Sequence, residues 1–107
     1  MVVAGRITGL AHGAKAMAQY IPDGFEAELA KLYFDTAGAA DPSAIGALKA
    51  IVPASHILFG SDYPFVPIAA TAVGLGRLGI AVADLQAIER DNALRLLPRL
   101  NPANPKN

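Results

Sequence analysis

The chain has 107 residues, 53% of them hydrophobic, and its 9 basic and 9 acidic residues give no formal net charge. This composition suits one small packed domain and excludes disorder, a nucleic-acid surface and a polybasic membrane patch, while the lack of cysteine excludes disulfides and thiolate metal sites. No apolar run reaches the roughly 20 residues of a membrane span, and Arg6 with nearby glycines interrupts any signal-peptide core, so we expect a cytoplasmic protein with no membrane partner.

The first third of the chain is expected to be helical up to a first strand. Residues 4–20 carry apolar side chains at helical spacing, although three glycines weaken the pattern. A turn at residues 22–24 precedes a short helix expected over Phe25 to Ala30. The aromatic run Leu32-Tyr33-Phe34 then predicts a short strand.

A helix and a second strand are expected next. Asp41 can cap a helix that begins at Pro42 and ends at Val52-Pro53. The strand expected over His56 to Gly60 contains three consecutive apolar residues, a pattern typical of parallel sheets that are covered on both faces.

The last third is expected to be helical. Residues 67–78 indicate a glycine-interrupted helix, and residues 84–100 indicate one or two helices, with Asp91 or Asn92 able to cap the second. Residues 101–107 are polar and are expected to form a loose tail. Helices alternating with strands predict a parallel α/β sheet. Because two strands leave both sheet edges unpaired, we expect the chain to assemble with copies of itself or to belong to a larger sheet.

Asp62 is the first charged residue after the second predicted strand, beside the rigid turn Tyr63-Pro64. Functional groups of α/β sheets and barrels gather at the carboxyl ends of strands, where a carboxylate can bind a metal or act as a general base. The alternative is structural: an aspartate that accepts hydrogen bonds from main-chain amides of its own turn. The spacing alone slightly favours this structural alternative.

Three other residues are weaker candidates. Asp35 also follows an apolar strand, where it can stabilise a turn or orient another group. His12 lies on the solvated face of the first predicted helix. His56 begins the second strand, about 16 Å of extended chain from Asp62, so the two cannot bind one ion. We expect both histidines to be structural or surface residues.

Two further patterns carry no chemistry in this interpretation. Gly74-Leu75-Gly76-Arg77-Leu78-Gly79 formally matches the dinucleotide-binding fingerprint, which requires a preceding strand and an acidic residue about 20 positions later. Here a helix is expected before it, and residues 94–99 contain no acid, so we interpret it as a chance match. No nucleophile has a base beside it, so a hydrolytic triad has no support.

Three stretches of the chain resemble the C-terminal part of the metal-dependent amidohydrolases of the aminocarboxymuconate semialdehyde decarboxylase type, the amidohydrolase-2 family. They are residues 32–37, 56–65 and 92–97, and the most specific element is Gly60-Ser61-Asp62-Tyr63-Pro64-Phe65. Within this family the chain is most similar to aromatic-acid decarboxylases such as 6-methylsalicylate decarboxylase.

The resemblance implies a (β/α)8 TIM barrel, of which residues 1–100 are the C-terminal portion, with the seventh and eighth strands at residues 32–35 and 57–60. It implies that Asp62 is the catalytic, metal-binding aspartate after the final strand, which reverses the preference for a structural role. The implied metal is Zn²⁺, with Mn²⁺ as the alternative. The implied reaction is nonoxidative decarboxylation of an aromatic or related carboxylic acid, or hydrolysis.

The chain departs from the family in its ligand set. The paired histidines of the first strand and those after the fifth and sixth strands are absent, and His12 matches none of them. A barrel of this kind needs about 250 residues, and a catalytic zinc needs about three protein ligands. We therefore expect an enzyme segment that is inactive alone and whose N-terminal partner is missing. The alternatives are a noncatalytic remnant that forms a homo-oligomer, and a small module that binds a cation through Asp62 and Asp35.

Overall fold

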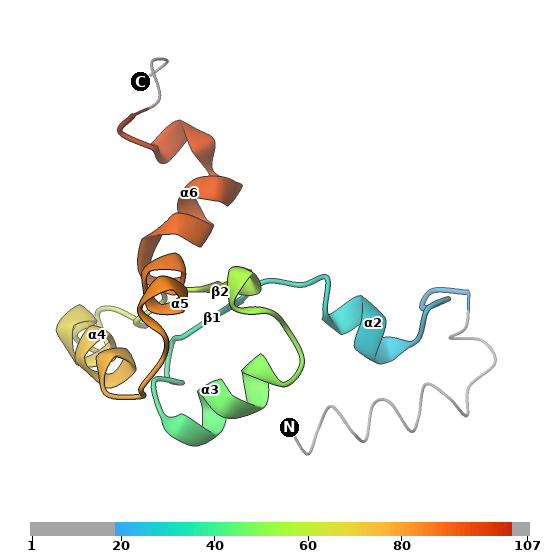
Figure 1. Ribbon diagram of the computed structural model, residues 1–107, viewed down its shortest axis with the longest axis horizontal. Coiled ribbons are helices and arrows are strands. Elements are labelled where there is room, and N and C mark those ends of the chain that lie inside the picture. Colours follow the sequence, from blue (N-terminus) through green and yellow to red (C-terminus); the bar gives the residue numbers. More distant parts are fainter. Residues whose placement is uncertain (1–18, 104–107) are drawn as a thin grey trace.

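The computed structural model describes residues 19–103, so the helix expected over residues 4–20 and the last part of the expected tail lie outside the described range. Figure 1 shows a small central strand pair with α3, α4 and α5 beside it, and with α2 and α6 extending from it in different directions. In chain order the elements are α2 (Phe25–Leu29), β1 (Phe34–Asp35), α3 (Pro42–Lys49), η2 (Ala54–His56), β2 (Ile57–Leu58), α4 (Ile68–Gly76), α5 (Val82–Gln86), η3 (Ala87–Asp91), α6 (Asn92–Leu96) and η4 (Pro98–Leu100).

The two strands pair in parallel, as the alternation of elements predicts. Phe34 lies opposite Ile57, and Asp35 lies opposite Leu58. The helix α3 makes the crossover between them. Within the described residues each strand has one neighbour, so both outer edges of the sheet are unpaired.

Both strands are shorter than the aromatic and apolar runs predict. The amide of Leu32 donates to the Leu29 carbonyl at 3.1 Å, so the turn after α2 continues into the residues expected to begin the first strand. His56 donates from its amide to the Pro53 carbonyl at 2.9 Å and belongs to the short 3₁₀ helix η2. Local turns therefore take the hydrogen-bonding groups that a longer strand would need.

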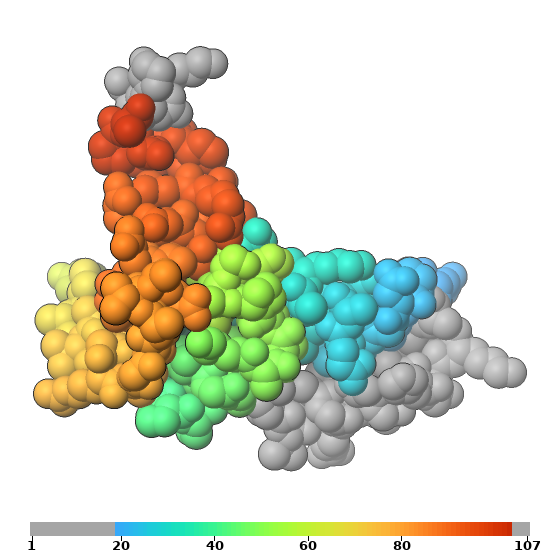
Figure 2. Space-filling view, viewed as in Figure 1, coloured from blue at the N-terminus to red at the C-terminus, as the bar shows by residue number. Residues whose placement is uncertain are grey.

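The buried core is small. It consists of Ile45 from α3, Val52, Ile57 from β2, Leu75 from α4 and Ile88 from η3, each at most 3% exposed. Large apolar side chains remain exposed elsewhere, on Tyr20, Leu32, Tyr33, Tyr63, Phe65, Ile68, Val73, Val82, Leu96, Leu97 and Leu100. The segment from α6 to residue 103, in orange and red in Figure 2, projects from the rest of the molecule. The described part of the chain thus leaves much apolar surface that a larger assembly could cover.

Asp41 caps α3, as the sequence predicts. Its Oδ1 accepts hydrogen bonds from the amides of Ser43 at 2.9 Å and Ala44 at 3.0 Å, and from the Ser43 hydroxyl, while Pro42 occupies the first helical position. The hydroxyl bond and then the Ala44 amide lower the pKa of Asp41 below its ordinary value.

This cap makes a prediction about acid stability. The lowered pKa contributes stability that is present above the carboxyl's ordinary value of 3.8 and is lost as the pH falls through its folded value. Asp41→Asn keeps an oxygen acceptor that does not titrate. We expect the difference in Tm, wild type minus Asp41→Asn, to decrease as the pH is lowered from about 7 to about 3. Thermal unfolding of both proteins measures this difference. A difference in Tm that stays constant over this range would contradict the role of the cap.

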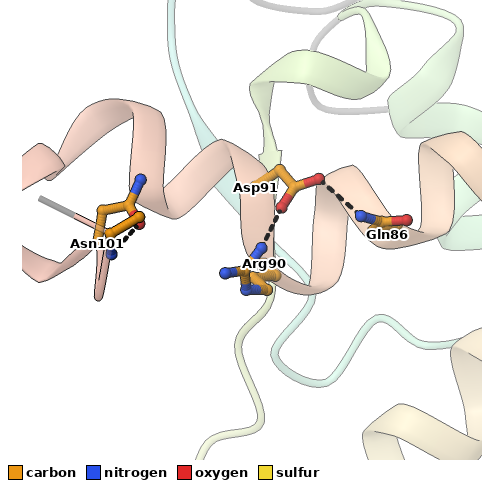
Figure 3. Close-up of polar contacts among 5 residues, drawn as sticks. Gln86, Arg90, Asp91 and Asn101 are labelled. Atoms are coloured by element: carbon orange, nitrogen blue, oxygen red, sulfur yellow. Dashed lines mark hydrogen bonds and ion pairs between the residues drawn. The ribbon is translucent and has the colours of Figure 1, made fainter.

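The C-terminal helices follow the predicted positions but not the predicted cap. The helix expected over residues 67–78 is α4, and the segment expected over residues 84–100 runs from α5 through the π-helical turn η3 into α6. Asp91 has helical dihedral angles and no capping bond. Its carboxylate instead accepts from Gln86 Nε2 at 3.2 Å and pairs with Arg90 at 3.0 Å (Figure 3). The capping prediction is wrong because the helix does not break there.

Asn92 points into the core rather than capping a helix. It is 1% exposed, and its Nδ2 donates to the carbonyls of Ala54 and Ile57, each at 2.8 Å. The adjacent turn of α6 adds a bond from Arg95 Nη2 to the Ser55 carbonyl at 2.6 Å. Side chains of α6 therefore hold the segment that leads into β2.

The expected tail is structured at its beginning. Residues 102–103 form a turn, and the amide of Ala103 donates to Asn101 Oδ1 at 3.0 Å. Figure 3 includes this contact. Residues 104–107 lie outside the described residues.

Candidate functional site

Asp62 follows β2 in a sharp turn. Its φ angle of 63° lies in the left-handed region, which aspartate tolerates better than most residues. The Asp62 carbonyl accepts the amides of Phe65 at 2.9 Å and Val66 at 3.2 Å, and the peptide bond between Tyr63 and Pro64 is cis. Main-chain bonds thus hold the turn.

The carboxylate of Asp62 is not used by that turn. The residue is exposed, and within the described part of the chain its side chain makes no hydrogen bond or ion pair. The structural alternative, in which the carboxylate accepts main-chain amides, therefore does not describe this turn. An unengaged carboxylate at the carboxyl end of a parallel strand is available to a ligand.

Asp35, at the end of β1, has a local role. Its Oδ1 accepts the Ala37 amide at 2.8 Å, which makes the turn that the sequence suggested as one alternative. Its side chain also lies against Gly60, where an added Cβ would come 2.9 Å from the Asp35 Cγ. The two aspartates thus follow neighbouring strands, but only Asp35 is used in its own turn.

Thr36 connects the two strand ends. It is fully buried, its amide donates to the Leu58 carbonyl at 3.1 Å, and its hydroxyl contacts both main-chain polar groups of Gly60. The sequence indicated that Thr36 could hydrogen-bond near Asp35, but not that its partner is Gly60, because a single threonine after a strand is a common turn residue.

His56 is structural, as expected. It precedes β2, whereas Asp62 follows it, so the two residues lie at opposite ends of the strand. Its Nδ1 lies 3.1 Å from the Leu32 carbonyl oxygen, and its ring stacks on Tyr33 with centroids 4.4 Å apart. His12 lies outside the described residues.

The glycine fingerprint is part of a helix, which agrees with the interpretation as a chance match. Gly74 and Gly76 belong to α4, and Gly79 follows it. A Cβ at Gly74 would come 3.0 Å from Ala40, so this glycine permits close packing of α4.

Asp62 carries an oxygen donor of the kind that metal sites use. In residues 19–103 no group of three or more histidine, cysteine, aspartate or glutamate side chains could hold a metal ion. A carboxylate oxygen suits zinc, manganese and magnesium, but a catalytic zinc needs about three protein ligands. The described residues around Asp62 therefore do not form a complete metal site.

An open hollow of about 230 Å³ lies between the loop after β1 and the beginning of α4. It is lined by Gly38, Ala40, Asp41, Val66, Ala70 and Thr71, and Asp62 is not among these residues.

Among the described helices, none is long and apolar enough to cross a membrane.

The left-handed backbone at Asp62 makes a stability prediction. Asp62→Ala is expected to destabilise the chain by about 1 kcal/mol, because alanine tolerates this conformation poorly. Asp62→Asn is expected to be neutral and Asp62→Gly neutral or stabilising, since both residue types adopt positive φ readily. Urea unfolding of the three variants measures this order. Equal stability of the alanine and glycine variants would contradict it.

The fold and the position of Asp62 together indicate a class of protein. Parallel strands joined by a helix, with an available carboxylate after the second strand, are typical of α/β enzymes that bind ligands at the strand ends. Residues 3–99 match the model of the amidohydrolase family, and the chain belongs to this family. The family resemblance seen in the sequence is confirmed.

The chain is similar to two aromatic-acid decarboxylases. It is 38% identical over 76 residues to 6-methylsalicylic acid decarboxylase from Aspergillus aculeatus, covering 66% of this chain and 23% of the relative. The solved structure of 2,6-dihydroxybenzoate decarboxylase from Rhizobium matches with a TM-score of 0.59 and 30% identity, covering 63% of this chain and 21% of that one. A structure of 2,6-dihydroxybenzoate decarboxylase with 2,6-dihydroxybenzoate bound matches equally well.

The matches also show how much of each relative this chain covers. The chain spans less than a quarter of the length of the relatives it matches. The solved relatives are TIM-barrel decarboxylases, whereas the described part of this chain has one unclosed pair of strands. The similarity is therefore to part of a barrel.

Proposed function

We propose that this chain is the C-terminal segment of a metal-dependent decarboxylase of the amidohydrolase family, acting on an aromatic carboxylic acid. In this proposal β1 and β2 are the seventh and eighth strands of the barrel, and residues 1–100 are its C-terminal portion. The observation that carries it is the unengaged Asp62 carboxylate after β2, in a chain whose relatives are aromatic-acid decarboxylases.

In the completed barrel, Asp62 contributes one oxygen ligand to the metal, which we propose to be Zn²⁺, with Mn²⁺ as the alternative. Such an ion, when bound, polarises a substrate oxygen or a water molecule. The contribution of this chain is positional. The turn bonds from Phe65 and Val66 leave the carboxylate unpaired and fix the backbone that carries it.

Decarboxylation is favoured over hydrolysis because the relatives at 38% and 30% identity are both named as decarboxylases. We propose an aromatic carboxylic acid as substrate, the class to which the acids in their names belong. A cytoplasmic location and the lack of a nucleic-acid partner stay predictions from the sequence.

The chain needs a partner to complete this site. Both outer sheet edges of the described residues are unpaired, and unpaired edges and exposed apolar faces favour pairing with another strand or element. We propose that a polypeptide carrying the rest of the barrel covers them, because the relatives are more than four times longer than the matched region. The isolated chain is therefore expected to show no turnover.

A chimera tests the proposal. The segment of the Aspergillus decarboxylase that matches this chain is replaced by this chain, and CO₂ release from 6-methylsalicylic acid is measured. We expect turnover by the chimera, and none by the isolated chain or by the relative truncated before the segment. Turnover by the isolated chain, or a chimera that folds and melts like the relative without activity, would contradict the proposal.

The noncatalytic alternative makes a different prediction. A self-assembling remnant would form a stable oligomer of this chain without metal. Size-exclusion chromatography with light scattering, in the presence of a chelator, distinguishes the two. A defined homo-oligomer together with an inactive chimera would favour the remnant.

A further inference from the structure

We propose that Thr36 is a positioning residue, and that it fixes the backbone from which the Asp62 side chain extends by holding Gly60. This inference rests on the metal-binding role of Asp62 proposed above and assigns a second residue to the same site. We call the contact between the Thr36 hydroxyl and the Gly60 main chain the Thr36–Gly60 bridge.

The bridge replaces a missing rung of the parallel ladder. The Thr36 amide donates to the Leu58 carbonyl at 3.1 Å, which is the last main-chain bond from β1 to β2. Beyond it, the Thr36 hydroxyl donates to the Gly60 carbonyl at 3.0 Å and accepts the Gly60 amide at 3.1 Å. One side chain thus satisfies both polar groups of Gly60, as a neighbouring strand would.

The bridge is sheltered and short-range. Thr36 is fully buried, so water does not compete for its hydroxyl. Gly60 is separated from Asp62 only by Ser61, which is itself 9% exposed. A shift of Gly60 is therefore passed to the Asp62 backbone with little room for compensation.

Asp62 lies between two fixed points. On one side is the Thr36–Gly60 bridge, and on the other are the bonds from Phe65 and Val66 to the Asp62 carbonyl. Its own carboxylate contributes nothing to this restraint within the described residues. The backbone anchors thus fix the point from which the Asp62 side chain extends, and its carboxylate oxygens stay available.

The identity of Gly60 supports the same arrangement. A Cβ at this position would lie 2.9 Å from the Cγ and Oδ1 of Asp35. Asp35 is in turn held by the Ala37 amide. Glycine lets the backbone approach β1 closely enough for both hydrogen bonds of the bridge.

The test uses two measurements, one on the complete chain and one on the chimera described above. Thr36→Val removes the hydroxyl while keeping the shape, Thr36→Ser restores the hydroxyl, and Thr71→Val removes a similarly buried threonine of α4 as a control. Amide hydrogen exchange at Gly60 reports the bridge without any metal. Paramagnetic broadening of the Ser61 to Tyr63 amide signals by Mn²⁺, measured in the chimera where the ligand set is complete, reports cation binding, with Asp62→Asn in the chimera as the reference for its loss.

We expect Thr36→Val to speed exchange at Gly60 by about fivefold or more and to weaken the Mn²⁺ effect by about tenfold. Thr36→Ser is expected to restore both, and Thr71→Val to change neither. If Thr36→Val does not fold, Gly60→Ala provides the second test, because it displaces the turn while the hydroxyl stays, and it should weaken the Mn²⁺ effect similarly.

The outcomes separate the two proposals. Mn²⁺ broadening that is absent from the chimera, or that persists in its Asp62→Asn variant, would contradict the metal role of Asp62. Broadening that depends on Asp62 but is unchanged in Thr36→Val, or not restored in Thr36→Ser, would overturn the positioning role of Thr36 alone.

Discussion

Asp62→Asn in the chimera is expected to lower the decarboxylation rate by at least about 100-fold. Losing a residue that only orients a metal ligand costs up to about 100-fold, and losing the ligand itself should cost at least as much. Asparagine keeps the shape of the side chain and tolerates the positive φ at this position, but it removes the negative charge. Initial rates of CO₂ release, together with the zinc content of the purified protein, measure the effect.

Asp35→Asn is the matched control for this result. It changes the same chemical group at the end of the neighbouring strand, and its amide oxygen can still accept from Ala37. We expect its rate to stay within a few fold of the wild-type rate. Activity that survives Asp62→Asn, or that is lost equally in Asp35→Asn, would show that the charge at Asp62 is not what the site needs.

Asn92→Ala is expected to destabilise the chain by about 3 kcal/mol. The substitution removes the donor that serves the Ala54 and Ile57 carbonyls and leaves a cavity beside the core. A domain of this length has a total stability of about 5–15 kcal/mol, and the small core places this chain at the low end. Urea unfolding followed by circular dichroism measures the loss.

Arg95→Ala provides a control on the same helix. Arg95 also donates to a carbonyl before β2, at Ser55, but the residue is exposed and water can replace it. We expect a cost below about 1 kcal/mol. An equal loss of unfolding free energy in Asn92→Ala and Arg95→Ala would show that burial does not determine how much each hydrogen bond stabilises the chain.

The order of elements could be predicted because the local signals around them were strong. Asp41-Pro42 carries a capping residue followed by a residue suited to the first helical turn, and the structure has this cap. The parallel pairing followed from alternation of helices and strands. Strand lengths could not be predicted, because they depend on neighbours and on the turns at Leu32 and His56 rather than on composition.

The role of Asn92 was missed because asparagine is common both as a helix cap and as a buried hydrogen-bonding residue. The missed signal was periodicity: Asn92 lies four positions after Ile88, so both fall on one helical face, and Ile88 is fully buried. A polar residue on a buried face indicates a specific hydrogen-bond partner. Thr36 could not be assigned in the same way, because its partner Gly60 is 24 positions away and is brought close only by the sheet.

The position of Asp62 was predicted from its place after an apolar strand, and the structure adds that its carboxylate has no partner among residues 19–103. The full ligand set could not be found in the sequence, since the described residues contain no cluster able to hold a metal alone. The incomplete set agrees with a match to less than a quarter of each relative.

A crystal structure of the chimera with zinc, with anomalous diffraction recorded at the zinc edge, tests the metal role of Asp62 most directly. We predict an anomalous peak about 2.0–2.2 Å from an Asp62 carboxylate oxygen. A zinc ion held entirely by the residues of the relative, with the Asp62 side chain turned toward solvent, would contradict it.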